Sequence, residues 1–255
     1  GWLAAAARPA RVLTLVMSDV PGDDPALVAS GPTVAPAPVV EAPLAIARRL
    51  DVTLSPALEA ALAEAARPAG DFSHCHSELI ATPMQSLRAA AARARQLGIT
   101  PIILGDSIEG EAREVAQVHA GIAQSVRRFG EPVAGPAVIL SGGETKVSFG
   151  AAQPGRGGRN TEFLLALGLA LASAARGAEG IHALACDTDG VDGSEDNAGA
   201  LWFDDSAARA RGAGIDLAGI LARHDSYSAF EALDTLVVCG PTQTNVNDFR
   251  AILVL

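Results

Sequence analysis

The sequence has few aromatic residues, few cysteines and no long apolar run, and each shortage excludes a class of protein. Aromatic residues make up only 4% of the 255 residues, so the core must be built mainly from Ala, Leu, Val and Ile. The three cysteines, Cys75, Cys186 and Cys239, are odd in number and far apart, which argues against a disulfide framework and favours a reducing, cytoplasmic location. The longest strongly apolar run, residues 163–175, is too short to span a bilayer.

Basic residues are also scarce. The chain carries 19 Lys and Arg against 29 Asp and Glu, which gives a formal net charge of −10. This balance argues against nucleic acid and anionic membranes as partners, because both attract positive surfaces. Hydrophobic residues make up 49% and charged residues 19%, which is typical of a globular protein, and the length allows one large or two modest domains.

Short apolar runs alternate with helical patterns, which predicts an α/β fold of mostly parallel sheets with flanking helices. Strands are expected over 11–18, 77–82, 100–104, 137–141, 181–186, 236–239 and 251–255, and helices over 42–50, 56–66, 84–97, 110–129, 161–175, 206–211, 216–223 and 226–233. Residues 145–149 are expected to pair with 137–141 as a hairpin. The break at 68–70 predicts a domain boundary, and residues 1–70 resemble the tail of a domain, because the strand at 11–18 needs further strands beside it.

The strongest chemical feature is the run Asp187-Thr188-Asp189-Gly190-Val191-Asp192-Gly193, directly after an expected strand. Carboxylates at the carboxyl end of a strand lie where open α/β sheets bind ligands, and they suit Mg²⁺. We therefore expect Asp187, Asp189 and Asp192 to be metal ligands. A plain Asp/Gly turn and a structural Ca²⁺ loop are the alternatives, although the EF-hand pattern fails at Val191 and Asp192.

A second motif, Gly155-Arg156-Gly157-Gly158-Arg159-Asn160, precedes an expected helix. Glycines let backbone N–H groups converge near a helix N-terminus, so Gly157, Gly158 and Asn160 are expected to bind an anion, with Arg159 recognising a carboxylate or phosphate. The alternative is a flexible loop with an Asn or Thr cap. The motif does not fit a dinucleotide-binding loop, because Asn160 replaces the last glycine.

Two further loops follow expected strands. Gly142, Gly143 and Glu144 could approach a phosphate or form a hairpin turn, but they do not form a P-loop. Thr242 and Asn245 lie in a polar run that could line a polyol site or bond its own turns.

Other features point to no site. The sequence His74-Cys75-His76 lacks the spacing of a zinc site, and no Gly-x-Ser-x-Gly elbow is present. His119, His182 and His224 are expected to be ordinary surface or core residues.

Five motifs occur in a fixed order: SDVPGDDPALVASGPT (18–33), LSGGET (140–145), GRGGRN (155–160), DTDGVDG (187–193) and GPTQTNVND (240–248). This set resembles the class II glycerate kinases, or glycerate 2-kinases, with their carboxy-terminal MOFRL domain. Members of this family are often named hydroxypyruvate reductase. The resemblance spans nearly the whole chain.

The resemblance implies that residues 1–70 end an amino-terminal Rossmann-like domain and that residues 71–255 form a linker region and the MOFRL domain. The active site would lie in a cleft between the two domains. A lysine of the family lies upstream of the matched region. Lys146, Thr161 and Gln243 depart from the family pattern without removing a carboxylate or Arg159.

The implied activity is ATP-dependent phosphorylation of D-glycerate, with 2-phosphoglycerate as the expected product and ATP and Mg²⁺ as co-substrate and cofactor. Arg159, Asp189, Asp192 and Asp19 would be catalytic, with Asp19 accepting the hydroxyl proton. Ser18, Asp23 and Thr33 would face the cleft. A homodimer is a candidate assembly. A second hypothesis is an NAD(P)H-dependent hydroxypyruvate reductase, which has less support because the sequence shows no dinucleotide-binding motif. A third hypothesis is a non-catalytic module that binds a sugar acid.

Overall fold

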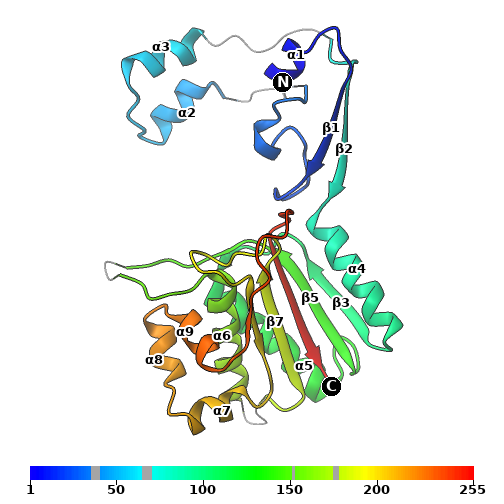
Figure 1. The fold of residues 1–255 in the computed structure, drawn as a ribbon, viewed down its shortest axis with the longest axis vertical. Helices are drawn as coiled ribbons and strands as arrows, with labels where there is room; N and C mark the ends of the chain where they lie inside the picture. The colour runs from blue at the N-terminus through cyan, green and yellow to red at the C-terminus, as the bar shows by residue number, and fades with distance from the viewer. Residues whose placement is uncertain (36–40, 65–70, 151–152, 175–177) are drawn as a thin grey trace. The chain divides into compact units, whose positions relative to one another are not determined.

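The computed structural model describes residues 1–35, 41–64, 71–150, 153–174 and 178–255 (Figure 1). These residues form two compact units. One contains Gly1–Val16 and Asp23–Ile80, and the other contains Met17–Gly22 and Ala81–Leu255. The expected boundary at 68–70 lies outside the described residues, and the division into a Rossmann-like end and a MOFRL part stays a prediction.

The first unit is small. Its elements are α1 (Trp2–Ala6), β1 (Val12–Met17), a 3-10 turn (Val28–Ser30), α2 (Pro43–Arg49), α3 (Pro56–Glu64) and β2 (Cys75–Ala81), the two strands reaching the start of the second unit. The strands pair as a two-stranded sheet, and Val12 N–H donates to His74 O at 2.9 Å. The expected strands and helices of this region are confirmed, whereas α1 was not expected.

The second unit is built on a six-stranded sheet. Its strands, in spatial order, are β3 (Thr100–Gly105), β5 (Ala137–Gly143), β10 (Asp248–Val254), β7 (Ile181–Asp187), β8 (Gly199–Trp202) and β9 (Leu236–Val237). The β3–β5 pair is parallel, and each of the other four neighbouring pairs is antiparallel. Four strands therefore point the same way, while β8 and β10 run against them.

The expected α/β class is confirmed, but two strands differ from the expectation. The carboxy-terminal strand β10 inserts between β5 and β7 in the opposite direction. Apolar periodicity could not show this, because a strand buried on both faces has the same pattern in either direction. The short strand β8 was not expected from the sequence.

Helices cover both faces of the sheet (Figure 1). They are α4 (Pro83–Gln96), α5 (Ala112–Phe129), α6 (Arg159–Ala172), α7 (Ser206–Gly212), α8 (Leu217–Ala222) and α9 (Ser226–Ala232). Val138 and Leu140 of β5 pack with α4, whereas Ala137 and Ile139 pack in the larger cluster with α5 and α6. Because alternate residues of a strand face opposite sides, these two clusters lie on the two faces of the sheet.

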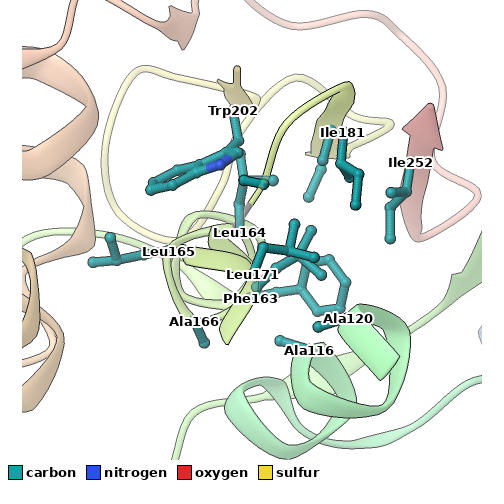
Figure 2. Close-up of a cluster of buried hydrophobic side chains, with 14 of the residues drawn as sticks. Ala116, Ala120, Phe163, Leu164, Leu165, Ala166, Leu171, Ile181, Trp202 and Ile252 are labelled. Atoms are coloured by element: carbon teal, nitrogen blue, oxygen red, sulfur yellow. The ribbon is translucent and has the colours of Figure 1, made fainter. Parts of the chain in front are cut away.

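Helix α6 is the centre of the larger core (Figure 2). Phe163, Leu164 and Leu165 are fully buried, and Trp202 of β8 packs in the same cluster. Small residues such as Ala116 and Ala120 on α5 allow the two helices to lie close together. A helix buried this deeply holds its first residue, Arg159, in a fixed place.

The expected hairpin of 145–149 with β5 is wrong. Strand β6 (Thr145–Lys146) pairs in parallel with β4 (Gly110–Glu111), which directly precedes α5. The reason is that β3 and β10 already occupy both edges of β5, so no edge remains for a hairpin partner.

No helix within the described part of the chain combines the length and the hydropathy that crossing a bilayer requires.

Candidate functional site

Four of the five sequence motifs meet at one end of the strands of the six-stranded sheet. Asp248, the first residue of β10, is in register with Gly143 at the end of β5 and with Asp187 at the end of β7. Because β10 is antiparallel to both neighbours, its start lies where they finish. The fold thus brings together loops that are up to a hundred residues apart in the sequence.

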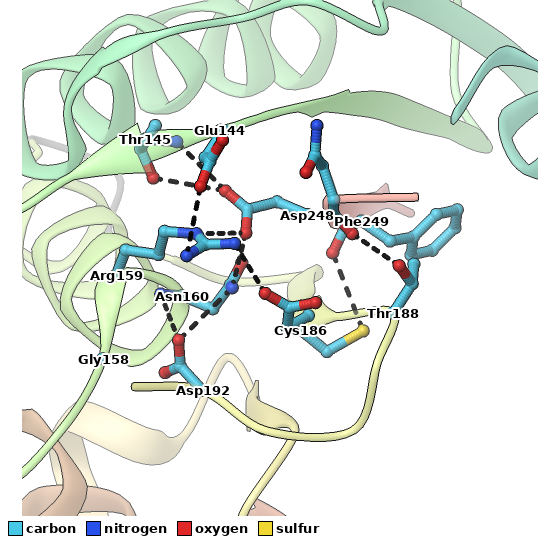
Figure 3. A network of polar contacts seen from close by, with 12 residues as sticks. Glu144, Thr145, Gly158, Arg159, Asn160, Cys186, Thr188, Asp192, Asp248 and Phe249 are labelled. Carbon is cyan, nitrogen blue, oxygen red and sulfur yellow. Dashed lines mark hydrogen bonds and ion pairs between the residues drawn. The ribbon is translucent and has the colours of Figure 1, made fainter. Parts of the chain in front are cut away.

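Arg159 lies at the centre of this end of the sheet (Figure 3). Its Nε donates to Asp248 Oδ1 at 2.7 Å and its Nη2 to Asp187 Oδ2 at 2.6 Å, while Nη1 lies 3.6 Å from Glu144 Oε1. Burial alone would lower the pKa of the guanidinium, but the carboxylates of Asp248, Asp187 and Glu144 outweigh burial and raise that pKa. Arg159 is therefore a permanent, well-oriented cation, and its role in anion binding stays a prediction.

A second arginine, Arg250, holds the other carboxylate oxygen of Asp248. Arg250 is fully buried, pairs with Asp248 Oδ2 and donates to Thr145 Oγ1 at 3.1 Å. With Oδ2 held in this way, Oδ1 faces Arg159. Asp248 and Arg250 could not be recognised from the sequence, because their importance depends on the register of β10.

Asp187 is buried, and its two oxygens are occupied within the protein. Oδ2 pairs with Arg159, and Oδ1 accepts from the N–H of Asp189 at 3.1 Å. Burial raises the pKa of Asp187 to about 6, and nearby Asp189 and Asp248 act in the same direction, although Arg159 opposes them.

Asp192 caps helix α6. Oδ1 accepts from Asn160 N–H at 2.9 Å, and Oδ2 accepts from Thr161 N–H at 2.8 Å and from Thr161 Oγ1 at 2.9 Å. The residue is 1% exposed, and burial raises the pKa of its carboxyl. Both oxygens therefore cap the helix, and the predicted role of Asp192 as a metal ligand is not tested by these contacts.

The remaining carboxylate of the motif is half-buried. Asp189 Oδ1 accepts from Val191 N–H at 2.8 Å, and Oδ2 has no hydrogen bond from the described residues. Within the described ranges, no group of three or more His, Cys, Asp or Glu side chains is arranged to hold a metal ion.

A cavity of about 340 Å³ opens beside Arg159. It is lined by Glu144, Thr145, Lys146, Val147, Phe149, Gly155, Gly157, Gly158, Arg159, Glu162, Gly193, His224 and Ser226. Two positions of the loop require glycine. A Cβ at Gly158 would overlap the carboxylate of Asp192, and Gly157 has a φ of +144°, which other residues rarely adopt.

Most backbone N–H groups of the glycine-rich loop donate to other atoms of the protein and are therefore not free to bind an anion. Gly155 N–H donates to Arg223 O at 3.0 Å, Arg156 N–H to Asp225 Oδ1 at 3.0 Å, and Gly158 N–H to Thr161 Oγ1 at 3.1 Å. The arginine and lysine side chains that line the cavity are those of Arg159 and the exposed Lys146.

The loop before β10 packs on the Asp187–Gly193 motif. Thr242 N–H donates to Asp189 O at 2.9 Å, and Asn245 Oδ1 accepts from Asn247 N–H at 3.0 Å. Asn247 Nδ2 donates to Asp19 O at 2.6 Å. Asn245 thus bonds its own turn, whereas Thr242 bonds the Asp187–Gly193 motif, and the polyol site stays a prediction.

The predicted residues from the first motif are divided between the units. Ser18 is buried and Asp19 exposed in the second unit, and neither lines the 340 Å³ cavity. Asp23 and Thr33 belong to the first unit, where Thr33 Oγ1 accepts from Thr14 at 2.8 Å. Their predicted roles are not tested by these contacts.

A cluster that the sequence analysis missed lies in the wall of the cavity. Glu162, one turn after Arg159, contacts Arg113 of α5 and His224 of the loop after α8. The expectation that His224 is an ordinary residue is wrong in this respect, because its ring pairs with a buried carboxylate at the cavity. His119 fits the expectation: it is 2% exposed and bonds Val115 O and Ser141 Oγ.

Comparison with known proteins agrees with these motifs. A family model described as the MOFRL family matches residues 137–248, and a model described as a domain of unknown function (DUF4147) matches residues 1–63. A protein of Agrobacterium vitis with the provisional name hydroxypyruvate reductase is 55% identical over 255 residues, which cover 100% of this chain and 65% of that protein. A glycerate kinase of Macaca fascicularis is 31% identical over 292 residues, covering 97% of this chain and 73% of its own length.

A solved structure shares the fold. The crystal structure of a glycerate kinase from Thermotoga maritima superposes with a TM-score of 0.87 at 31% identity, covering 99% of this chain and 59% of that one. The chain spans 57–65% of the length of two Agrobacterium vitis relatives. The ordered motifs, the matched domain models and the shared fold lead to one conclusion: the chain belongs to the glycerate 2-kinase family with its MOFRL domain.

Proposed function

We propose that the protein transfers the γ-phosphoryl group of ATP to D-glycerate and forms 2-phosphoglycerate. The observation that carries this proposal is Arg159, a cation oriented by Asp187 and Asp248 beside a cavity of about 340 Å³. The volume lies within the range of small-molecule sites. The glycerate kinases among the relatives support the same substrate.

Phosphoryl transfer needs positioning and neutralisation of charge more than covalent catalysis by the protein. The guanidinium of Arg159 is suited to a planar carboxylate or to the oxygens of a transferring phosphoryl group. Lys146, which lines the same cavity, would attract the second anion as a flexible point charge. The location of the site between two domains and the proton-accepting role of Asp19 stay predictions.

The described residues fit Mg²⁺ at one carboxylate only. Both oxygens of Asp187 and of Asp192 are engaged within the protein, whereas Asp189 keeps Oδ2 without a partner among the described residues. Mg²⁺ is commonly held by one or two carboxylates together with phosphate oxygens. Asp189 would therefore hold the ion, which would supply charge neutralisation to the nucleotide phosphates.

The test is phosphorus NMR of the full-length protein with D-glycerate, ATP and Mg²⁺. A new phosphomonoester signal together with ADP is expected, and its proton coupling identifies the phosphorylated hydroxyl. Arg159→Gln should reduce the rate at least about 100-fold. Arg156→Gln is the matched control, because Arg156 lies in the same loop but pairs with Glu195 and Glu231 at the surface. Unchanged ATP with the wild type would refute the kinase proposal.

The name of the Agrobacterium vitis relative supports a second candidate, the reduction of hydroxypyruvate by NAD(P)H. Loss of absorbance at 340 nm, where the reduced cofactor absorbs, on adding hydroxypyruvate would favour it. The homodimer and the cytoplasmic location stay predictions.

A further inference from the structure

We infer that His224 is the general base of the site and that Glu162 positions it. This inference rests on the proposed phosphorylation of D-glycerate. It starts from Glu162, whose side chain is 2% exposed in the wall of the cavity beside Arg159. A buried carboxylate is costly unless it is paired, so its partners show what it serves.

Arg113 and His224 share one oxygen of Glu162. Oε1 accepts from Arg113 Nε and lies 2.9 Å from His224 Nδ1, while Oε2 has no partner among the described residues. Arg113 neutralises the carboxylate and also donates to Leu221 O. The charge of Glu162 is thus balanced without a charged histidine, and the contact with Nδ1 serves another purpose.

The His224 ring is held on several sides. Its Nδ1 lies between Glu162 Oε1 and Arg113 Nη2, and its ring forms a T-shaped pair with Phe149, with ring centroids 5.3 Å apart at 85°. The backbone of His224 has a φ of +53°, because the residue directly follows the C-cap of α8 and its N–H donates to Leu221 O in the left-handed turn that ends the helix. The side chain is 22% exposed, so the ring is fixed but reachable.

The partners assign the proton of the ring. Nδ1 lies 2.9 Å from an acceptor, Glu162 Oε1, and 2.8 Å from a donor, Arg113 Nη2. Because Arg113 Nη2 already donates to Leu221 O, we place the hydrogen of the neutral ring on Nδ1, where it donates to Glu162. Nε2 then keeps its lone pair and has no partner among the described residues. A histidine that is oriented by a carboxylate at Nδ1 and that lines a ligand cavity has the arrangement of a general base.

The charged groups that line the two adjoining cavities at His224 come from several elements. They are Glu111, Arg113, Glu114, Glu144, Lys146, Arg159 and Glu162. Asp19, the base expected from the sequence, lines neither cavity. Among the described side chains that line the 340 Å³ cavity, His224 is the neutral base, and its Nε2 has no hydrogen-bond partner in the described residues.

His224 Nε2 accepts the proton of the glycerate hydroxyl while the hydroxyl oxygen forms its bond to the γ-phosphorus of ATP. The bond between that phosphorus and the bridging oxygen breaks, and ADP leaves with the electron pair. The proton on Nε2 passes to solvent after the product leaves.

The experiment is a pH profile of kcat for the full-length protein and for His224→Asn, with His182→Gln as the control. Asn tolerates the positive φ of this position and can still donate to Glu162. The wild type should lose activity on the acid side as Nε2 becomes protonated. His224→Asn should lower kcat about 100-fold or more, change the KM for D-glycerate less than threefold, and remove that acid-side loss.

His182 lies on β7 against Phe203 and does not line the cavity, so its variant should match the wild type. Glu162→Gln should lower kcat less than His224→Asn. His224→Gly leaves room at the cavity, and added imidazole should restore part of its activity. If the wild type phosphorylates glycerate and His224→Asn keeps its acid-side loss with kcat within threefold, only this inference is overturned. An inactive wild type overturns the proposed function and the inference together.

Discussion

Asp192 and Thr161 form a helix cap across thirty residues of sequence. The Asp192 carboxylate accepts the N–H of Thr161 at 2.8 Å and its hydroxyl at 2.9 Å, and its other oxygen accepts the N–H of Asn160. The first residue of the capped helix is Arg159. The cap therefore holds the cation of the site in place, and two of the sequence motifs act as one structural unit.

Removal of this cap should reduce stability. Asp192→Ala leaves the N–H groups of Asn160 and Thr161 buried without an acceptor, and we expect the free energy of unfolding to fall by about 2–4 kcal/mol. Urea denaturation followed by circular dichroism measures the change. Asp196→Ala, at an exposed residue of the same loop, is the control. Unchanged stability of Asp192→Ala together with a lost requirement for Mg²⁺ would instead support Asp192 as a metal ligand.

Two helical glycines should respond in opposite directions to substitution by alanine. In a helix, Gly→Ala ordinarily stabilises by about 1 kcal/mol. Gly121 on α5 has nothing near its missing Cβ, so Gly121→Ala should show this gain. A Cβ at Gly168 on α6 would overlap the indole ring of buried Trp202, so Gly168→Ala should lose about 1–3 kcal/mol.

Thermal unfolding monitored by tryptophan fluorescence compares the two variants directly. If Gly168→Ala were as stable as Gly121→Ala, the packing of α6 against β8 would be looser than the structure shows.

The sequence predicted where strands and helices lie better than it predicted which strands pair with one another. The strand and helix at 181–186 and 161–175 were expected, because apolar runs and turn residues mark them locally. The pairing of β6 with β4 was missed, since it depends on which edges of β5 are already occupied. Local pattern carries no information about such occupancy.

The candidate site shows the same limit. Arg159 was found because a glycine-rich loop before a helix is a local signal. Glu162 and His224 were missed because they are 62 residues apart and meet only through the packing of α6 and the loop after α8. The acidic motif could not show that Asp192 caps α6, because a carboxylate that caps a distant helix and a carboxylate that binds a metal have the same sequence pattern.

Asp189 should control the requirement for Mg²⁺. Its Oδ2 has no partner in the described part of the chain, so Asp189→Asn should raise the Mg²⁺ concentration for half-maximal activity at least about tenfold. The measurement is a Mg²⁺ titration of the kinase reaction at fixed ATP. Glu195→Gln, at a carboxylate that pairs with Arg156, should leave the titration unchanged. An unchanged Mg²⁺ requirement in Asp189→Asn would exclude Asp189 as the metal ligand.

The contribution of Asp187 to stability depends on pH, and the sign of this dependence shows whether burial or ion pairing sets the pKa of Asp187. Burial raises its pKa from 3.8 to about 6 in spite of Arg159. Between these two pH values the folded protein holds a proton on Asp187 that the unfolded chain has released, so the contribution of Asp187 to stability falls as the pH rises and is lost above pH 6. Asparagine has no such proton, and the stability of Asp187→Asn relative to the wild type should increase by about 2–3 kcal/mol from pH 4 to pH 7.

Urea denaturation of both proteins at several pH values measures this difference, and it cancels the titration of the other carboxylates. If the ion pair with Arg159 dominated instead, the pKa of Asp187 would lie below its ordinary value and the wild type would gain on Asp187→Asn as the pH rises. The two causes thus predict opposite slopes. A slope of the expected sign would mean that Arg159 holds a partner that is neutralised in mildly acidic solution, which leaves the guanidinium freer to bind an anionic substrate there.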